Sequence, residues 1–421
     1  QHTFSIVQHL GIRLGMQNPY WITNRDNFIN HKNRFLVSGG LSYDIAKGIT
    51  LGARAKMDYT SAIYEKKYSA STDAIFAQKY GAYYKADAST RQLYGDVMLN
   101  IDKYFGDFSL IGTVGVSIQD LDYQYYSVGG DLNSVANSFT LKNLNQSNAE
   151  FDQDGYHDQT QSIFATAQLG WQSKLYLDVT GRIDWSSALA WTETKSVAYP
   201  SVGLSAILTD LLPIRSDVLT FLKLRGSYSE VGNAPTRYIA YQTHPYQSGT
   251  PSTTSTYPNS DIKPERTKAW EVGLQSRFWG DKLALNVSLY KTSTFNQLFN
   301  PSLPSSSGYS SIYINGGQVD NKGIEASLSL NQALGPVEWN STLTYTINRN
   351  KIKKLLKPTT LKDGLLVEQD MLDLDGVGNV KTRLFEGGSV GDLYVTALRT
   401  DEHGYIDVDY VNNTVSVDGN A

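Results

Sequence analysis

The sequence predicts an all-β fold, a transmembrane antiparallel up-and-down β-barrel, and three observations support this prediction. Apolar and polar residues alternate with a period of two along most of the chain, which is typical of strands with one apolar and one wet face. Long and short connections alternate between these stretches. Charged residues recur on the polar face, where a packed soluble core would leave them without partners.

The stretch 175–185 illustrates the alternation. Leu177, Val179 and Ile183 fall on one face, while Asp178 and Arg182 fall on the other. About thirteen such stretches occur, each near the roughly 9 to 11 residues of a tilted transmembrane strand or somewhat longer. They begin near residues 3, 33, 49, 90, 107, 158, 174, 198, 219, 267, 282, 321 and 337.

The connections between these stretches alternate strictly in length. Short turns are predicted at 44–48, 105–107, 172–174, 279–281 and 332–336, with a longer apolar turn at 209–217. Long loops are predicted at 17–32, 61–88, 120–157, 231–266, 294–320 and from 350 onward, with a shorter one at 186–197. Outer-membrane barrels have this asymmetry, with long loops outside and short turns in the periplasm. A soluble β-sandwich or propeller, the alternative, does not require it.

Side chains on the two faces fit the same interpretation. The charges on the polar face suit a water-filled lumen or one closed by a separate polar plug, and they are Arg182, Asp184, Lys223, Arg225, Glu271, Arg277 and Glu325. Aromatic residues near the strand ends suit interfacial girdles, and they are Tyr43, Tyr59, Tyr104, Trp171, Trp270, Phe278 and Trp339.

Composition excludes several classes of protein. The 421 residues carry 37 basic and 41 acidic side chains, for a net charge of −4, so no basic surplus exists to neutralise nucleic-acid phosphates. Cysteine is absent, which excludes disulfides and thiolate metal sites. No window has the roughly 18 uninterrupted apolar residues of a membrane helix.

The odd strand count predicts that the chain is part of something longer. A single-chain bacterial barrel closes with an even number of strands, and the start at Gln1 lacks a signal peptide. We expect 1–352 to form a partial barrel. We expect 353–421 to form a long extracellular loop region that leads to C-terminal strands outside this sequence.

Several motifs then point to a family. They are Asn18-Pro19-Tyr20-Trp21, Tyr199-Pro200-Ser201-Val202-Gly203-Leu204, Leu222-Lys223-Leu224-Arg225-Gly226-Ser227-Tyr228, Val231-Gly232-Asn233, Ile262-Lys263-Pro264-Glu265-Arg266, Trp270-Glu271-Val272-Gly273-Leu274, Asn315-Gly316-Gly317, Asn321-Lys322-Gly323-Ile324-Glu325 and Asn348-Arg349-Asn350-Lys351-Ile352. In this order and spacing they resemble the barrel of SusC/RagA-type TonB-dependent transporters, most closely from 198 to 352.

The resemblance implies a barrel of about twenty-two strands in the outer membrane of a Gram-negative bacterium. It also implies an N-terminal plug, a TonB box before the plug and a SusD-like lipoprotein as a lid; this sequence has no segment that matches the plug or the box. The implied activity is import of oligosaccharides or oligopeptides, driven through TonB and without enzymatic chemistry. A passive porin or adhesin barrel is the alternative.

Candidate site residues are aromatic. Aromatic side chains in the outer loops offer flat apolar faces for sugar rings or peptide side chains, and the alternative role for each of them is to rigidify the loops or to bind the lid protein. They are Tyr20, Trp21, Tyr83, Tyr84, Tyr123, Tyr125, Tyr126, Trp191, Tyr309 and Tyr313.

One acidic segment has the composition of a cation loop. Asp370, Asp373, Asp375 and Asn379 provide closely spaced oxygens of the kind that calcium prefers. Their spacing misses the EF-hand pattern, and a solvated acidic loop is the alternative that we favour. The six histidines have no metal-ligand spacing, and the sequence contains no catalytic motif. We therefore expect no cofactor, no metal and no enzymatic activity.

Overall fold

The computed structural model describes residues 17–355, except 213, 215 and 248, and short segments beyond 355. Those segments are 359–360, 366–367, 371–373, 380–395, 397–406, 408–409, 414–415 and 417–418. No helix among these residues has the length and apolar character needed to cross a membrane.

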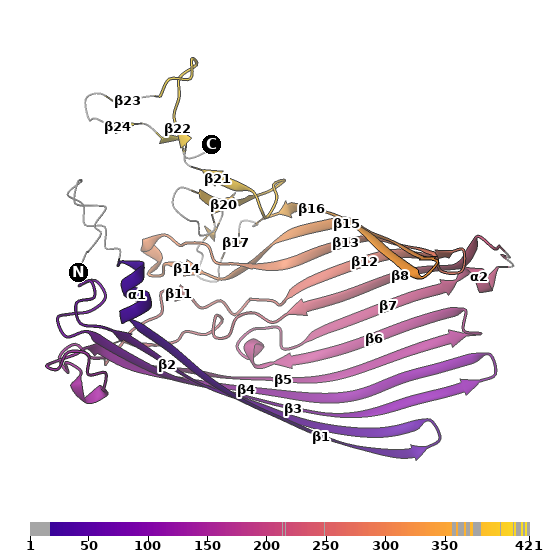
Figure 1. Ribbon diagram of the computed structural model, residues 1–421, viewed down its shortest axis with the longest axis horizontal. Coiled ribbons are helices and arrows are strands. Elements are labelled where there is room, and N and C mark those ends of the chain that lie inside the picture. Colours follow the sequence, from indigo (N-terminus) through magenta and orange to yellow (C-terminus); the bar gives the residue numbers. More distant parts are fainter. Residues whose placement is uncertain are drawn as a thin grey trace. The chain divides into compact units, whose positions relative to one another are not determined.

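The described residues form one large sheet of twelve strands, in the order β1-β2-β3-β4-β5-β6-β7-β8-β12-β13-β15-β16 (Figure 1). Its strands are β1 (Asn27–Ala46), β2 (Ile49–Tyr68), β3 (Ala82–Phe105), β4 (Phe108–Asp131), β5 (Glu150–Trp171), β6 (Leu175–Ser186), β7 (Val197–Ile207), β8 (Leu219–Asn233), β12 (Glu265–Phe278), β13 (Leu283–Phe299), β15 (Ile314–Leu334) and β16 (Val337–Lys354). Each strand pairs with the next large strand along the chain, and the pairs from β6 to β16 are antiparallel. The predicted all-β up-and-down fold is confirmed.

Small elements occupy the connections. They are α1 (Pro19–Arg25), α2 (Leu208–Leu211), η1 (Leu141–Asn143), η2 (Ser187–Leu189), η3 (Ser305–Ser307), β9 (Tyr246–Gln247), β10 (Thr250–Pro251), β11 (Thr256–Tyr257), β14 (Ser311–Ile312), β17 (Thr359–Thr360), β18 (Leu366–Val367), β19 (Met371–Asp373), β20 (Val380–Phe385), β21 (Leu393–Val395), β22 (Ala397–Leu398), β23 (Val408–Asp409), β24 (Thr414–Val415) and β25 (Val417–Asp418).

The strands extend farther into the long connections than predicted. The loops predicted at 61–88, 120–157, 231–266 and 294–320 shrink to 69–81, 132–149, 234–264 and 300–313, and the loop predicted at 17–32 contains α1 and the start of β1. At these strand ends the backbone pairing continues although the residues on both faces are polar. The alternation of apolar and polar residues that marks a strand in the sequence is therefore absent there. The strand predicted near residue 3 lies outside the described residues.

The chain forms two compact units. One consists of 1–43, 51–98 and 116–161, and the other of 44–50, 99–115 and 162–421. The second unit contains the short turns between β1 and β2 and between β3 and β4. Gly48 in the first of these turns has φ +68°, and an added Cβ would lie 2.0 Å from the carbonyl oxygen of Asp102. Glycine is needed there because both the backbone angle and the close approach exclude a side chain.

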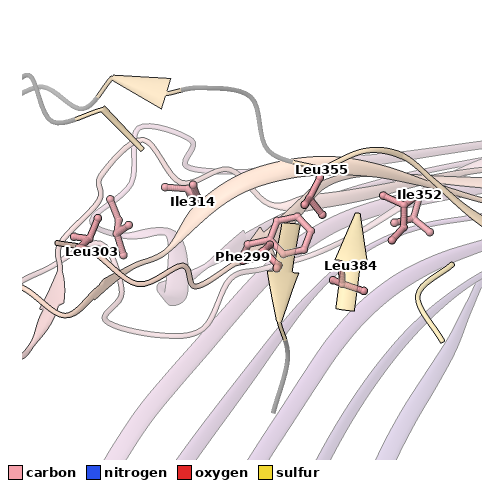
Figure 2. Close-up of a cluster of buried hydrophobic side chains, with 9 residues drawn as sticks. Phe299, Leu303, Ile314, Ile352, Leu355 and Leu384 are labelled. Atoms are coloured by element: carbon pink, nitrogen blue, oxygen red, sulfur yellow. The ribbon is translucent and has the colours of Figure 1, made fainter. Parts of the chain in front are cut away.

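A loop-end core closes one end of the second unit. Phe299, Ile314 and Ile352 are buried together with Leu355 and Leu384 (Figure 2). Ile352 also exchanges backbone hydrogen bonds with the chain that follows β20, through N–H donation to Gly388 O at 2.9 Å and acceptance from Gly387 N at 2.8 Å. The segment after β16 therefore docks against the end of that strand.

Candidate functional site

The polar face of the second unit is a network of charged side chains between neighbouring strands. Arg225 on β8 donates to Glu271 on β12 at 3.0 Å and to Ser288 on β13 at 2.6 Å. Lys223, Arg225 and Glu271 help to line a hollow of about 340 Å³ on this face. A charged, water-accessible surface of this kind can bind polar solutes without forming bonds to them.

The first unit has a comparable hollow of about 550 Å³, lined in part by Arg54, Asp58 and Tyr94. Arg54 donates to the fully buried carboxylate of Asp96 at 2.8 Å. Arg34 makes a two-point contact with Asp58, one point of which measures 2.8 Å. Such two-point contacts hold a guanidinium in a fixed plane.

Two of the sequence motifs, Leu222–Tyr228 on β8 and Trp270–Leu274 on β12, contact each other. On the polar face, the side chain of Arg225 lies across Gly273, where an added Cβ would be 2.3 Å from Arg225 Nε. On the opposite face, the rings of Tyr228 and Trp270 lie 4.4 Å apart between centroids. Each motif therefore supplies one half of an ion pair and one half of an aromatic pair, and these contacts hold β8 to β12.

The motifs Ile262–Arg266 and Asn315–Gly317 are joined through Asn315. Its side chain accepts from Lys263 N at 2.6 Å and donates to Lys263 O at 2.8 Å. Glu265 accepts from Leu298 N at 2.8 Å. These bonds hold the start of β12 to the end of β13 and the start of β15, where the long loops leave the sheet.

The opposite face of the second unit is an apolar band. Val272 is the next residue after Trp270 on this face of β12, toward the short turns. It belongs to a row of directly paired residues across five strands, and the row consists of Gly226, Val272, Leu289, Ile324 and Ile347. On β12 the band runs from Trp270 to Phe278, eight residues or about 26 Å along a strand. This is comparable to the apolar height of a tilted membrane strand, and aromatic residues lie at both of its ends, as the sequence predicts.

The candidate aromatic residues fall into different environments. Asn18 caps α1 by accepting from Tyr20 N at 2.9 Å, and Trp21 Nε1 on that helix donates to Thr72 Oγ1 at 2.9 Å. Trp21 therefore holds the helix to the loop at 69–81, whereas Tyr20 is 81% exposed. Of this pair, only Tyr20 presents a free ring.

Four of the candidates in the first unit are packed. Tyr83 is buried beside Leu132 and Leu144, and its hydroxyl donates to Glu65. Tyr84 is half-buried and packs against Gly129. Tyr123, also half-buried, stacks on Tyr156 at 5.0 Å, and Tyr125 is half-buried. Tyr126, a fifth candidate, on β4, is 50% exposed and its ring offers a large free surface.

In the second unit one candidate joins a residue that was not predicted. Trp191 stacks on Tyr241 with 4.6 Å between centroids, and both remain about half exposed. Tyr309 packs edge-on against Tyr257 at 5.2 Å beside the loop-end core, and Tyr313 is half-buried. Sequence reasoning missed Tyr241 because it lies fifty residues from Trp191, in another connection, and no pattern links the two.

The acidic candidates are only partly described. Asp370, Asp375 and Asn379 lie outside the described residues. Asp373 on β19 accepts from Arg383 Nε at 2.7 Å and from Lys381 Nζ. These two cations, Arg383 first, lower the pKa of Asp373 to about 2. The described residues contain no group of three acidic or histidine side chains that could hold a metal ion, and the absence of a calcium site at this segment stays a prediction.

The chain is similar to a known protein family and to several known proteins. Residues 6–384 match the family described as TonB dependent receptor-like, beta-barrel. TonB-dependent receptor P3 of Formosa agariphila is 27% identical over 61% of this chain and 27% of the relative. TonB-dependent receptor P39 of the same organism is 25% identical over 76% of this chain and 30% of the relative.

A solved structure, the RagAB peptide transporter, superposes with a TM-score of 0.75 and 20% identity over 96% of this chain and 45% of the transporter chain. The present chain therefore spans less than a third of the curated relatives and less than half of that transporter chain. Because the family match covers most of the sequence, and the strand order and charged polar face agree with it, the chain belongs to the TonB-dependent receptor β-barrel family of the outer membrane.

Proposed function

We propose that the full-length protein imports oligosaccharides or oligopeptides across the outer membrane of a Gram-negative bacterium, together with a SusD-like surface lipoprotein. The observation that carries this proposal is the superposition on the RagAB peptide transporter over 96% of the chain. The charged hollows on the polar face support it, because a polar solute passing along that face meets fixed hydrogen-bonding groups.

The mechanism is a change of access without covalent chemistry, so the protein is not an enzyme. The lipoprotein captures the substrate and delivers it to the long loops, and the substrate then rests between loops, lumen wall and plug. TonB, driven by the inner-membrane proton gradient, pulls on the plug and opens a path. The pull does work because it favours one conformation of the plug over another.

Within this chain, the stack of Trp191 and Tyr241 is the site that we assign to substrate contact. Two half-exposed rings at 4.6 Å present a flat apolar surface with a polar edge. Replacing both with alanine should weaken substrate binding by about two- to tenfold. Tyr405→Ala, which removes an exposed ring that stacks on no described aromatic residue, is the matched control.

The experiment compares the full-length protein with and without its TonB box, using radiolabelled oligosaccharide and oligopeptide mixtures. The truncated protein should bind substrate as before and fail to import it. Equal uptake by the two proteins would contradict energy coupling. If neither class of oligomer binds the intact protein, the proposed substrate class is wrong.

A further inference from the structure

A row of side chains crosses the apolar face of the second unit at the edge of the apolar band nearest the long loops. Each member pairs directly with the next across neighbouring strands, and the row consists of Tyr228, Trp270, Lys291, Lys322 and Arg349. Its last three members, here called the basic row, place three cations on the adjacent strands β13, β15 and β16.

Two of the three cations in the basic row have no carboxylate partner among the described residues. Adjacent strands lie about 4.8 Å apart, and like charges directly opposite each other destabilise a sheet. Lys322 has a cation on either side. Asp320 lies 3.8 Å from Lys291 Nζ and also accepts from Gln318, while no carboxylate among the described residues pairs with Lys322 or Arg349. An anion from outside the chain would relieve this repulsion.

Two other cations on this face of the second unit share a carboxylate. On β8 and β12, Glu230 pairs with Arg266 and lies 3.6 Å from Lys268. Lys322 and Arg349 differ from these two cations, because no carboxylate among the described residues pairs with either of them.

The surface next to the basic row suits hydrocarbon. Leu289, Ile324 and Ile347 form the next row toward the short turns, and each lies on the same strand and face as one of the three cations. Leu343 and Tyr345 continue the apolar face on β16 and are 70% and 58% exposed. A ligand that touches both rows combines an anionic group with apolar chains.

We propose that the basic row binds the phosphate of a phosphorylated lipid headgroup in the outer leaflet, with the lipid's acyl chains against the apolar rows below. Arg349 can offer two parallel donors to one phosphate, and the lysines supply point charges. The cations lie at the long-loop edge of the band, which is the outer side in barrels of this kind. This site does not depend on the imported substrate.

The test uses full-length protein in detergent, with bound lipid counted by native mass spectrometry. Added lipids are a bisphosphorylated lipid A and its enzymatically dephosphorylated form. The variant Lys322→Gln/Arg349→Gln should bind the phosphorylated lipid about tenfold more weakly than the parent, because two charge-assisted bonds are lost. The control Lys79→Gln/Lys142→Gln removes the same charge from exposed loop positions and should bind it as the parent does.

Two results would overturn the proposal. The first is equal retention of phosphorylated lipid by the parent and the Lys322→Gln/Arg349→Gln variant. The second is inorganic pyrophosphate displacing the lipid at equal concentration, since a site for free phosphate would gain nothing from the apolar rows. Weak and equal binding of the dephosphorylated lipid by all proteins would support the assignment to a phosphate.

Discussion

At the scale of single residues, glycine positions show how closely the sheet is packed. An added Cβ at Gly323 would lie 2.4 Å from the carbonyl oxygen of Ile347 and 2.5 Å from Tyr290 Oη. The Tyr290 ring therefore covers this glycine on the polar face. Gly181 lies on the apolar face of β6, with Val179 and Ile183, and has nothing within 4 Å of its added Cβ.

Gly323→Ala should destabilise the barrel by about 1–3 kcal/mol, because the new methyl group must displace backbone as well as the tyrosine ring. Urea unfolding of the full-length protein in lipid vesicles measures the change. Gly181→Ala is the control and should stay within about 0.5 kcal/mol of the parent. Equal effects of the two substitutions would mean that the close approach at Gly323 is relaxed at no cost.

Asp373 gives a prediction for pH. Its pKa of about 2 in the folded protein is below the roughly 3.9 of an unfolded aspartate. Pairing with Arg383 and Lys381 therefore stabilises the contact of β19 with β20 fully above about pH 4, and this contribution is lost as the pH falls through about 2. Carbon NMR of labelled aspartate, assigned with Asp373→Asn, measures the titration. A midpoint near 4 would contradict the pairing.

At the scale of the strand, the accuracy of the sequence prediction depends on the kind of turn that comes before. The strands after short turns begin at 49, 108, 175, 219, 283 and 337, each within one residue of the prediction. The strands after long connections begin at 27, 82, 150, 197, 265 and 314, between one and eight residues early. Turn residues and the apolar band mark the first kind of boundary, whereas nothing in the sequence marks where paired polar strands separate.

The two faces of one strand should respond oppositely to added charge. Leu274 lies midway along the apolar band of β12, and Gln275 lies next to it on the polar face. Leu274→Arg should cost about 2–4 kcal/mol, as a cation does at the middle of a bilayer. Gln275→Arg should cost less than about 1 kcal/mol, because water on the polar face weakens its repulsion from the directly opposed Lys223.

The same vesicle unfolding assay distinguishes the two variants, and their adjacency makes each the control for the other. Similar losses at both positions would mean that the face assignment of β12 is wrong. This outcome would also remove the basis for placing the apolar band in lipid.

At the scale of the whole molecule, the family and the fold could be predicted from the sequence, but the site could not. Arg225 and Glu271 are 46 residues apart, and only the register of β8 against β12 brings them together. The sequence predicts Trp21 and Tyr83 as candidates for substrate contact, yet the hydrogen bond of Trp21 holds a helix to a loop and that of Tyr83 joins strands β2 and β3. A residue type in a loop does not reveal its partner, because loop contacts depend on tertiary packing.

The importer and the passive porin differ in electrical behaviour. The importer proposal places a plug in the lumen, so purified full-length protein in a planar lipid bilayer should carry little current. Removing the plug segment should produce large, steady conductance of the kind that open barrels show. High conductance from the intact protein would favour the porin, and no current from either form would show that this barrel does not conduct.

The contact of two motifs across β8 and β12 has a consequence for how this family changes over time. The ion pair of Arg225 with Glu271 and the ring contact of Tyr228 with Trp270 each depend on two residues that are distant in the sequence. Gly273 must stay small for as long as Arg225 lies across it. Substitutions at these positions should therefore be inherited together, and a lineage that loses one partner should also replace the other.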